Sequence, residues 1–476
     1  MKRALLIIVL AIAALIAVLL VRTFTMTSRQ ITAAAVSPPQ IDRDAAVARF
    51  ARAIQFRTVS GQPHEEFVAW LAQTYPRVHA SMRREVVGNG ALLFTWAGSD
   101  PSLAPLLLMG HYDVVPVEPG TKWTHDPFSG AVADGFIWGR GTLDDKGTVI
   151  ATLEAAELLL GQNHHPRRTI LFAFGADEEV GGANGAAVVA RLLASRGVKL
   201  DAVIDEGGVI AIDSVEGAPK PVALIGIAEK GMASVELRSR GSGGHSSMPP
   251  ERTEVGRIAA AVDRVQQRPF DAGVKGAAEA MFRWLGPEMP FGKRMVFANL
   301  WLFEPVLEGM AKRSTSLNAT LRTTTAPTII GGGVKDNVIP SEARAVINFR
   351  ILPGETVEQV VDHVRRAVDD EKVQVRLEDS AWDPSPVSDA EAPQFRALQR
   401  TIMQTFPDTI VAPYLVVGAT DARYFRSLSA NVYRFTPVAM RQRDLSRVHG
   451  IDERVEVEAY VRAIAFYVLL MRNMGG

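Results

Sequence analysis

The sequence predicts an α/β protein with three parts: a large domain built on a mostly parallel sheet, a smaller α+β domain inserted into it, and an N-terminal transmembrane helix. Three observations carry this prediction. Short apolar runs recur along the chain, and helical stretches separate the first three, as in domains with parallel strands. Between residues 229 and 380 the apolar runs give way to alternating apolar and polar residues and to amphipathic helical stretches. The extreme N-terminus is almost purely apolar.

Length and composition narrow the classes of protein that remain. The chain has 476 residues, which is more than one compact core usually holds, so two domains are expected. The 52 basic and 52 acidic residues balance, which argues against a nucleic-acid partner. There is no cysteine, so disulfides and thiolate metal sites are excluded. Any bound metal must therefore be held by histidines and carboxylates.

The N-terminus predicts a membrane anchor. Residues 4–21 carry no charge and as a helix would span about 27 Å, close to the roughly 30 Å of a bilayer core. The apolar region of a signal peptide is shorter, about 7–15 residues, and the nearest run of small residues is 33–35. We expect an uncleaved anchor, with a cleaved signal or a buried helix as alternatives. Lys2 and Arg3 favour a cytoplasmic N-terminus and a body outside the cytoplasm.

The change in pattern sets the expected domain boundaries. Residues 1–40 are interpreted as the anchor and a polar tether, and 41–228 as the first part of the large domain. Between 229 and 380, alternating strands and amphipathic helices indicate an insertion with its own small core. The apolar runs then resume, so 381–476 complete the large domain. Within the insertion, 269–325 fit neither pattern well.

Polar clusters follow the apolar runs at the points where strands are expected to end. HYD follows the run at 105–110, ADEE the run at 169–175, DEGG the run at 201–204 and ATDAR the run at 414–418. Ligand sites in parallel sheets lie at the carboxyl ends of the strands. We therefore expect these polar groups to gather at one edge of the sheet.

The first two clusters have the residue types of a metal site. His111 and Asp113 lie two apart, so on a strand end both side chains point the same way. A carboxylate beside a histidine orients a metal-binding imidazole. Asp144 and Asp145, in GRGTLDDKG, begin a helical stretch. Taken singly, each cluster is compatible with an ordinary surface histidine or a helix N-cap.

Taken together, the clusters indicate a bound cation. Glu178 with Glu179, Asp205 with Glu206, and the late His449 join the groups above. So many carboxylates on one edge would repel one another unless a cation lay between them. Zinc accepts histidine nitrogen and carboxylate oxygen, and one carboxylate can bridge two ions.

The motifs resemble those of a known family. HYDVVP, GRGTLDDKG, ADEEVGG, IDEGG and HGIDE are similar, in order and spacing, to the signature motifs of the M20 metallopeptidases. The carboxypeptidase S and N-acyl-amino-acid hydrolase branch is the most similar. The resemblance runs from about residue 42 to the C-terminus, and it implies a zinc-peptidase domain with an inserted lid domain.

The resemblance implies a pair of zinc ions. Asp144 would bridge them, His111 and Asp205 would hold one ion, and Glu179 and His449 would hold the other. A set of histidines and carboxylates also accepts Co²⁺ or Mn²⁺.

The resemblance also assigns the groups around the metals. Asp113 would fix the ring of His111, and Glu178 would be the general base that takes a proton from the attacking water. The bond between Asp144 and Asp145 would be a cis peptide, with Asp145 in a supporting role.

Further residues are implied to contact the substrate. His245, in RGSGGHSSMPP, would stabilise the oxyanion of the tetrahedral intermediate. In dimeric members of the family, the matching histidine reaches the active site of the partner subunit. Asn337 and Arg350 would hold the substrate from the lid, and the guanidinium fork of Arg350 suits a carboxylate. Gly418 would contact the carboxylate end of the substrate through its backbone.

The implied reaction is zinc-dependent hydrolysis of the amide bond to the C-terminal residue of a peptide or dipeptide, releasing an amino acid. The alternative substrate is an N-acyl, including N-fatty-acyl, amino acid, with condensation as the reverse reaction. A metal-binding protein without catalysis and a structural anchor protein are more remote readings. The sequence leaves monomer and homodimer both open.

Overall fold

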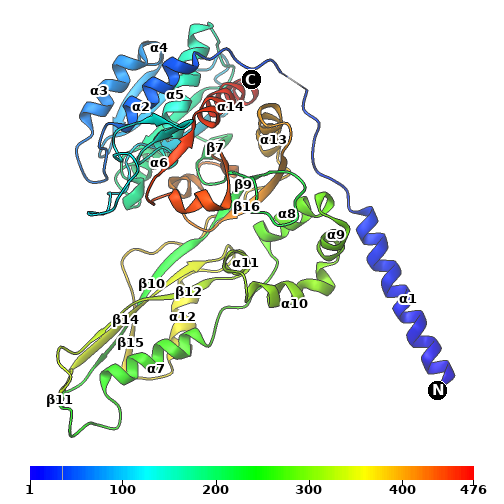
Figure 1. The fold of residues 1–476 in the computed structure, drawn as a ribbon, viewed down its shortest axis with the longest axis vertical. Helices are drawn as coiled ribbons and strands as arrows, with labels where there is room; N and C mark the ends of the chain where they lie inside the picture. The colour runs from blue at the N-terminus through cyan, green and yellow to red at the C-terminus, as the bar shows by residue number, and fades with distance from the viewer. Residues whose placement is uncertain (35) are drawn as a thin grey trace.

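The computed structural model describes residues 1–34 and 36–476 and confirms the predicted α/β class. Figure 1 shows a large domain, an elongated inserted domain below it, and the helix α1 (Lys2–Thr25) projecting to one side. The two domains are built on separate sheets.

The sheet of the large domain is mixed, with a parallel centre. Its strand order is β1-β2-β6-β3-β7-β17-β9-β8-β18, and β16 pairs with β9. β3 (Leu106–His111) pairs in parallel with both β6 (Ile170–Gly175) and β7 (Ala202–Asp205). β16 (Ile410–Val416) runs parallel to β9 (Val222–Glu229). The four apolar runs thus form β3, β6, β7 and β16, as predicted.

Of the remaining strands, β17 lies between β7 and β9 within this sheet, and the others lie toward its margins or in small additions to the fold. The remaining strands are β1 (Arg83–Val87), β2 (Ala91–Trp96), β4 (Val132–Ala133), β5 (Phe136–Trp138), β8 (Ile210–Ala211), β11 (Gly244–His245), β13 (Val338–Ile339), β17 (Val432–Arg434), β18 (Ala439–Met440) and β19 (Arg454–Glu456).

Helices cover both faces of the large sheet. α5 (Lys146–Gly161) packs against α14 (Val457–Gly475) on one face, and α6 (Ala186–Ser195) lies on the other. Both faces of the sheet are therefore apolar, which explains why its strands are continuous apolar runs rather than alternating ones. The other helices of this domain are α2 (Arg43–Ile54), α3 (Glu65–Thr74), α4 (Pro76–Ser81) and α13 (Pro393–Thr405).

The inserted domain is an antiparallel sheet covered by two helices. The strand order is β12 (Thr324–Gly332), β14 (Glu342–Ile351), β10 (Gly231–Arg240) and β15 (Val373–Leu377). α7 (Glu254–Gln266) and α12 (Val357–Val368) bury their apolar faces against it. A capping box formed by Thr356 and Gln359 begins α12, which satisfies backbone N–H groups at its N-terminus.

Most of the segment 269–325, which fitted neither pattern in the sequence, is helical. It forms α8 (Gly276–Leu285), α9 (Phe291–Ala298), α10 (Leu300–Ala311) and α11 (Thr315–Leu321). α8 packs against β16 of the large domain, where the ring of Trp284 lies 5.1 Å from that of Phe395. This helical segment therefore contributes to the core of the large domain as well as to the insertion.

Candidate active site

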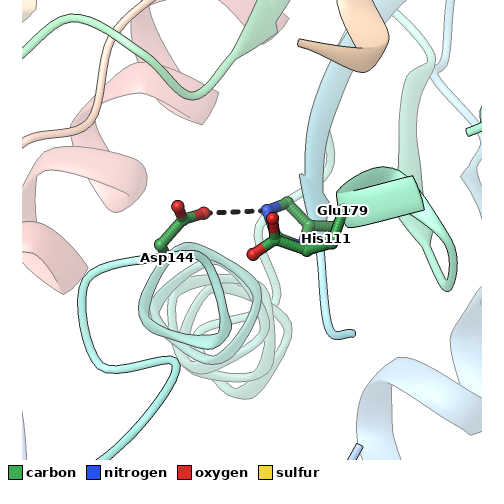
Figure 2. Close-up of side chains that lie close together, drawn as sticks. All are labelled: His111, Asp144 and Glu179. Carbon is green, nitrogen blue, oxygen red and sulfur yellow. Dashed lines mark hydrogen bonds and ion pairs between the residues drawn. The ribbon is translucent and has the colours of Figure 1, made fainter. Parts of the chain in front are cut away.

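The predicted polar groups meet at the carboxyl edge of the parallel strands. β3 ends at His111, the turn after β6 carries Glu178 and Glu179, and β7 ends at Asp205. Figure 2 shows His111 and Glu179 facing Asp144, which comes from the loop before α5. Adjacent parallel strands place these ends side by side, which is how residues far apart in the sequence converge.

Asp144 lies between the two histidines. Its Oδ1 is 3.0 Å from Nε2 of His111, and its Oδ2 is 2.9 Å from Nε2 of His449. The same nitrogen of His449 lies 3.1 Å from Oε2 of Glu179. Each oxygen of Asp144 thus faces a different histidine, which is the arrangement required of a bridging carboxylate.

At the end of β7, the acid beside His111 is the neighbour of the one expected there. Oε1 of Glu206, and not the carboxylate of Asp205, lies 3.3 Å from Nε2 of His111. The carboxylate of Asp205 accepts hydrogen bonds from the backbone N–H groups of Glu206 at 3.0 Å and Ala422 at 2.8 Å. Successive side chains of a strand point to opposite sides, so one of this acidic pair faces the cluster and the other faces away.

Asp113 supports both the imidazole and the turn beside it. Nδ1 of His111 lies 3.0 Å from the backbone oxygen of Asp113 and 3.4 Å from its Oδ1. The carboxylate of Asp113 also accepts hydrogen bonds from the backbone N–H groups of Glu178 at 3.1 Å and Glu179 at 3.2 Å, and from Oγ of Ser60 at 2.7 Å. This buried carboxylate therefore fixes the ring and the turn together.

Glu178 adds a further carboxylate to the cluster, beside His111 and Glu206. Its Oε2 is 4.0 Å from Nε2 of His111. Burial raises the pKa of the Glu178 carboxyl well above its usual range, although the charge of His111 opposes this rise. A raised pKa makes a carboxylate a stronger base, which suits a group that accepts a proton.

The crowded charges shift one another. Burial, followed by the negative charge of Asp144, raises the pKa of Glu206 to about 8. Burial would also raise the pKa of Asp144, but hydrogen bonds from His111 and His449 outweigh it and lower this pKa. Hydrogen bonds to Asp144 and Glu179 raise the pKa of His449 to about 10. The cluster strongly favours positive charge at its centre.

The donor set fits a divalent metal. Two groups of three residues offer ligand atoms within 4.8 Å of one another: His111 with Asp144 and Glu179, and His111 with Glu178 and Glu206. His449 joins the first group through Asp144 and Glu179. Oε1 of Glu179 is buried and has no hydrogen-bond partner within the described parts of the chain. A buried carboxylate oxygen of this kind is costly unless a cation or a donor faces it.

A residue that the sequence analysis left unassigned organises the loop carrying Asp144. Oε1 of Glu453 accepts hydrogen bonds from the backbone N–H groups of Gly141 at 3.0 Å and Leu143 at 2.8 Å. Its Oε2 accepts one from Arg140 at 2.6 Å, and Arg140 also donates to the backbone oxygen of His449 at 3.1 Å. Glu453 was visible in the sequence as the last residue of HGIDE. The peptide bond between Asp144 and Asp145 in this loop is cis, as the resemblance implied.

Two of the expected substrate residues lie far from the cluster. His245 pairs with Val338 where β11 meets β13, and the N–H of Ser246 donates to the backbone oxygen of Asn337 at 3.2 Å. Figure 1 shows β11 at the end of the inserted domain opposite the large domain. The structure therefore brings His245 and Asn337 close to each other but not to the carboxylates.

Arg350 and Gly418 lie nearer the large domain. Arg350 is near the end of β14 and pairs with Met232, just after the connection from the large sheet. Burial lowers the pKa of its guanidinium. Gly418 lies in the loop after β16, which is fixed where the N–H of Thr420 donates to the buried Glu229 at 2.9 Å.

Comparisons with known proteins give this geometry a context. The chain is 40% identical over 473 residues to the probable carboxypeptidase S-like 2 of Dictyostelium discoideum, covering 96% of this chain and 91% of that protein. It is 43% identical over 414 residues to the N-fatty-acyl-amino acid synthase/hydrolase of Homo sapiens, covering 86% and 82%.

The fold is shared with a solved structure. The M20 family metallo-carboxypeptidase Sso-CP2 from Sulfolobus solfataricus superposes with a TM-score of 0.67 at 18% identity, over 90% of this chain and 99% of that one. The sequence pattern of peptidase family M20/M25/M40 matches residues 107–473, which include His111, Asp144, Glu178, Glu179 and His449. The chain therefore belongs to peptidase family M20/M25/M40 and is a metallo-amidohydrolase.

Proposed function

We propose that this enzyme hydrolyses the amide bond to a C-terminal amino acid in a peptide or dipeptide, as a carboxypeptidase S-like enzyme, and releases that amino acid. One observation carries the proposal: Asp144 lies between His111 and His449 with one oxygen toward each, and Glu178 lies beside them.

The proposed cofactor is a pair of zinc ions. His111 and Glu206 would hold one ion, Glu179 and His449 the other, and Asp144 both. Co²⁺ and Mn²⁺ suit the same donors. Bound there, zinc supplies a Lewis acid for the scissile carbonyl and lowers the pKa of the attacking water.

Glu178 is proposed to move the proton. Its carboxylate takes a proton from the water as the oxygen attacks the carbonyl carbon, and it delivers that proton to the leaving nitrogen as the carbon–nitrogen bond breaks. Asp113 has a positioning role, because it holds the backbone N–H groups of Glu178 and Glu179 as well as the ring of His111.

The inserted domain is proposed to bind the substrate. Arg350 offers a bidentate partner for a free carboxylate, and Gly418 offers its backbone beside the same end. His245 and Asn337 are remote from the proposed metal ligands of the same chain. They would reach the substrate by closure of the inserted domain or from the partner subunit of a homodimer, and His245 would then stabilise the oxyanion.

N-fatty-acyl amino acids are the second candidate substrate. The observation that favours them is the 43% identity to the human protein whose name describes that activity. The membrane helix is proposed to keep the enzyme at a lipid surface, where acylated substrates concentrate. The body of the enzyme is proposed to lie outside the cytoplasm. A secreted or periplasmic protein, cleaved after the helix, is the alternative.

A paired assay tests the proposal. The zinc-loaded full chain is incubated with a dipeptide and with an N-fatty-acyl amino acid that release the same residue, each with and without a chelator. Chelator-sensitive release from the dipeptide supports the peptidase, and release mainly from the acyl substrate supports the second candidate. Zinc binding without cleavage of either substrate would refute the proposed substrate classes.

A further inference from the structure

The outward face of α10 is apolar along its whole length. Two rows at helical spacing, each i, i+4 and i+8, present only apolar or small side chains to the exterior. All six residues are exposed: Trp301, Pro305, Gly309, Leu302, Val306 and Met310. We call these residues the α10 face.

The inward face of the same helix is already used. Leu307 and Ala311 are buried in a small core with Phe282 and Leu321. A helix that is apolar on both sides is expected where both sides are covered. A contiguous exposed apolar strip of this kind marks a contact surface rather than ordinary solvent-facing helix.

The α10 face adjoins the end of the candidate membrane span. Among the residues that the structure describes, α1 is the one helix long and apolar enough, by length and composition, to cross a membrane. Its last turns dock on the segment that joins α9 to α10. Nε of Arg22 donates to the backbone oxygen of Ala298 at 3.1 Å, and Nδ2 of Asn299 donates to that of Leu19 at 3.2 Å and to Oγ1 of Thr23 at 3.3 Å.

Aromatic and basic contacts strengthen this junction. The ring of Phe24 lies 5.8 Å from that of Phe291, which is the exposed first residue of α9. Arg294 donates to the backbone oxygens of Thr23 at 3.0 Å and Met26 at 2.6 Å. Figure 1 shows α9 beside the end of α1 and α10 following it.

The chain leaving α1 is also bound to the body. Arg29 pairs with Glu391 at 2.9 Å, and its backbone oxygen accepts hydrogen bonds from Arg396 and Gln399. Gln30 exchanges two hydrogen bonds with the backbone of Val411. A membrane crossed by α1 is therefore held at a set position relative to α10, rather than at the end of a free tether.

We propose that the α10 face, together with Phe291, is a membrane-contact surface that lies in the interfacial layer of the bilayer crossed by α1. Trp side chains favour this layer, and Trp, Phe and Leu form the lipid-facing side of helices that lie in it. Lys312 and Arg313, directly after α10, are exposed and would face anionic headgroups. The occupant is lipid and not a second copy of the chain, because the patch is continuous with the end of the span. The proposal concerns where the enzyme sits and is independent of its substrate.

Depth-dependent quenching tests the proposal on the full chain. The sequence has no cysteine, so single cysteines report cleanly. A fluorophore is attached to Val306→Cys in lipid nanodiscs that contain anionic lipid, with a nitroxide lipid labelled near the headgroup. Val132→Cys, on the large domain, is the matched control, because both valines are 53% exposed. Ile12→Cys, 52% exposed within α1, reports on the span with a nitroxide near the bilayer centre.

The expected result is loss of most of the fluorescence at position 306 and no loss above background at position 132. Quenching at position 12 with no excess at 306 over 132 would overturn the contact surface while leaving the span. Absence of quenching at both 12 and 306 would overturn the span and the surface together. Protection of position 306 that depends on protein concentration and not on lipid would assign the face to a second copy instead. The measurement contains no substrate, so its failure is distinct from failure of the proposed function.

Discussion

Oε1 of Glu206 lies 3.3 Å from Nε2 of His111, although the preceding residue, Asp205, is the acid that motif resemblance selected. Asp205 instead accepts backbone hydrogen bonds that join the end of β7 to the turn containing Ala422. The two adjacent acids therefore have different contacts: Glu206 faces His111, and Asp205 holds the end of β7 to the turn containing Ala422.

Substitutions at these two acids should separate metal binding from stability. If the proposed pair of ions is bound, Glu206→Gln is expected to lower the metal content by about half, because it removes one of the proposed anionic ligands. Asp205→Asn should leave the metal content unchanged but lower Tm. The side-chain NH2 of asparagine cannot accept a hydrogen bond, so the N–H of either Glu206 or Ala422 loses its acceptor, at a cost of about 1–3 kcal/mol. Metal analysis after dialysis and thermal unfolding give the two readouts. Loss of metal from the Asp205 variant alone would return the ligand role to that residue.

Glu178→Gln tests the proton-transfer role. The substitution preserves shape but removes the basic carboxylate, so turnover should fall by about 10²–10⁴-fold while KM changes little. Metal content should stay at the wild-type level, because Glu178 is the proposed base and is not one of the proposed metal ligands; its Oε2 lies 4.0 Å from Nε2 of His111. Steady-state kinetics on metal-quantified protein provide the measurement. Near-normal turnover in this variant would remove the general-base assignment.

Glu453 is predicted to be a positioning residue. Glu453→Gln replaces an acceptor that faces Arg140 with an amide donor, so the loop that carries Asp144 should lose its fixed conformation. Metal affinity should fall by about 10–100-fold, as for other residues that support ligands. Metal release to a competing chelator measures this effect. Glu456→Gln, an exposed substitution on β19, is the control and should release metal at the wild-type rate.

Much of the fold followed from the sequence because its signals are local. The apolar runs that became β3, β6 and β7 are buried on both faces, so their composition alone marked them as strands. The amphipathic period predicted α7 and α12 for the same reason. The helices α8 to α11 were missed because glycine and proline interrupt the segment, at Gly276, Gly286, Pro290 and within α10 at Pro305. In addition, α8 packs against the large domain rather than its own.

The candidate site could be predicted from the sequence less completely than the fold, because its contacts depend on which way individual side chains point. Motif spacing located His111, Asp144 and Glu179, which the fold brings together. Spacing could not show which of two adjacent acids faces inward, since that depends on where β7 ends. Nor could it show that Glu453 binds a loop more than 300 residues earlier in the chain, because a hydrogen bond of this kind leaves no local pattern.

Arg350→Ala should weaken binding of substrates with a free carboxylate. A hydrogen-bonded charge pair contributes about 1.5–3 kcal/mol, so KM for a free-acid substrate should rise by roughly 10–150-fold with a smaller change in kcat. The amidated form of the same substrate should respond much less. Arg344→Ala, in the same strand and paired with Glu236, is the matched control and should leave both KM values unchanged. An equal response of free-acid and amidated substrates would show that Arg350 does not bind the carboxylate.

Lys230 should make stability depend on pH at the connection between the two sheets. It is fully buried, and its Nζ donates to the backbone oxygens of Ala319 and Arg322 at 2.8 Å each. Burial lowers its pKa to about 7, from about 10.4 in an unfolded chain. Between these values the unfolded chain binds a proton that the folded chain has released, so the free energy of unfolding rises with pH.

The pH dependence is isolated by comparing wild type with Lys230→Met. Methionine leaves the two carbonyl oxygens without their donor, so the variant should be less stable than wild type at high pH, where neutral lysine fits the buried site. As pH falls from 9 to 7, wild type should lose this advantage by up to about 1.4 kcal/mol per pH unit. The reason is that Lys230 binds a proton in the unfolded chain but not in the folded one, so lower pH stabilises the unfolded state. Tm measured for both proteins across this range gives the difference, and Lys220→Met, at an exposed lysine, should run parallel to wild type. If the difference between wild type and Lys230→Met is the same at pH 7 and pH 9, Lys230 keeps its proton in the folded chain, and its two carbonyl partners are then sufficient to hold a buried ammonium.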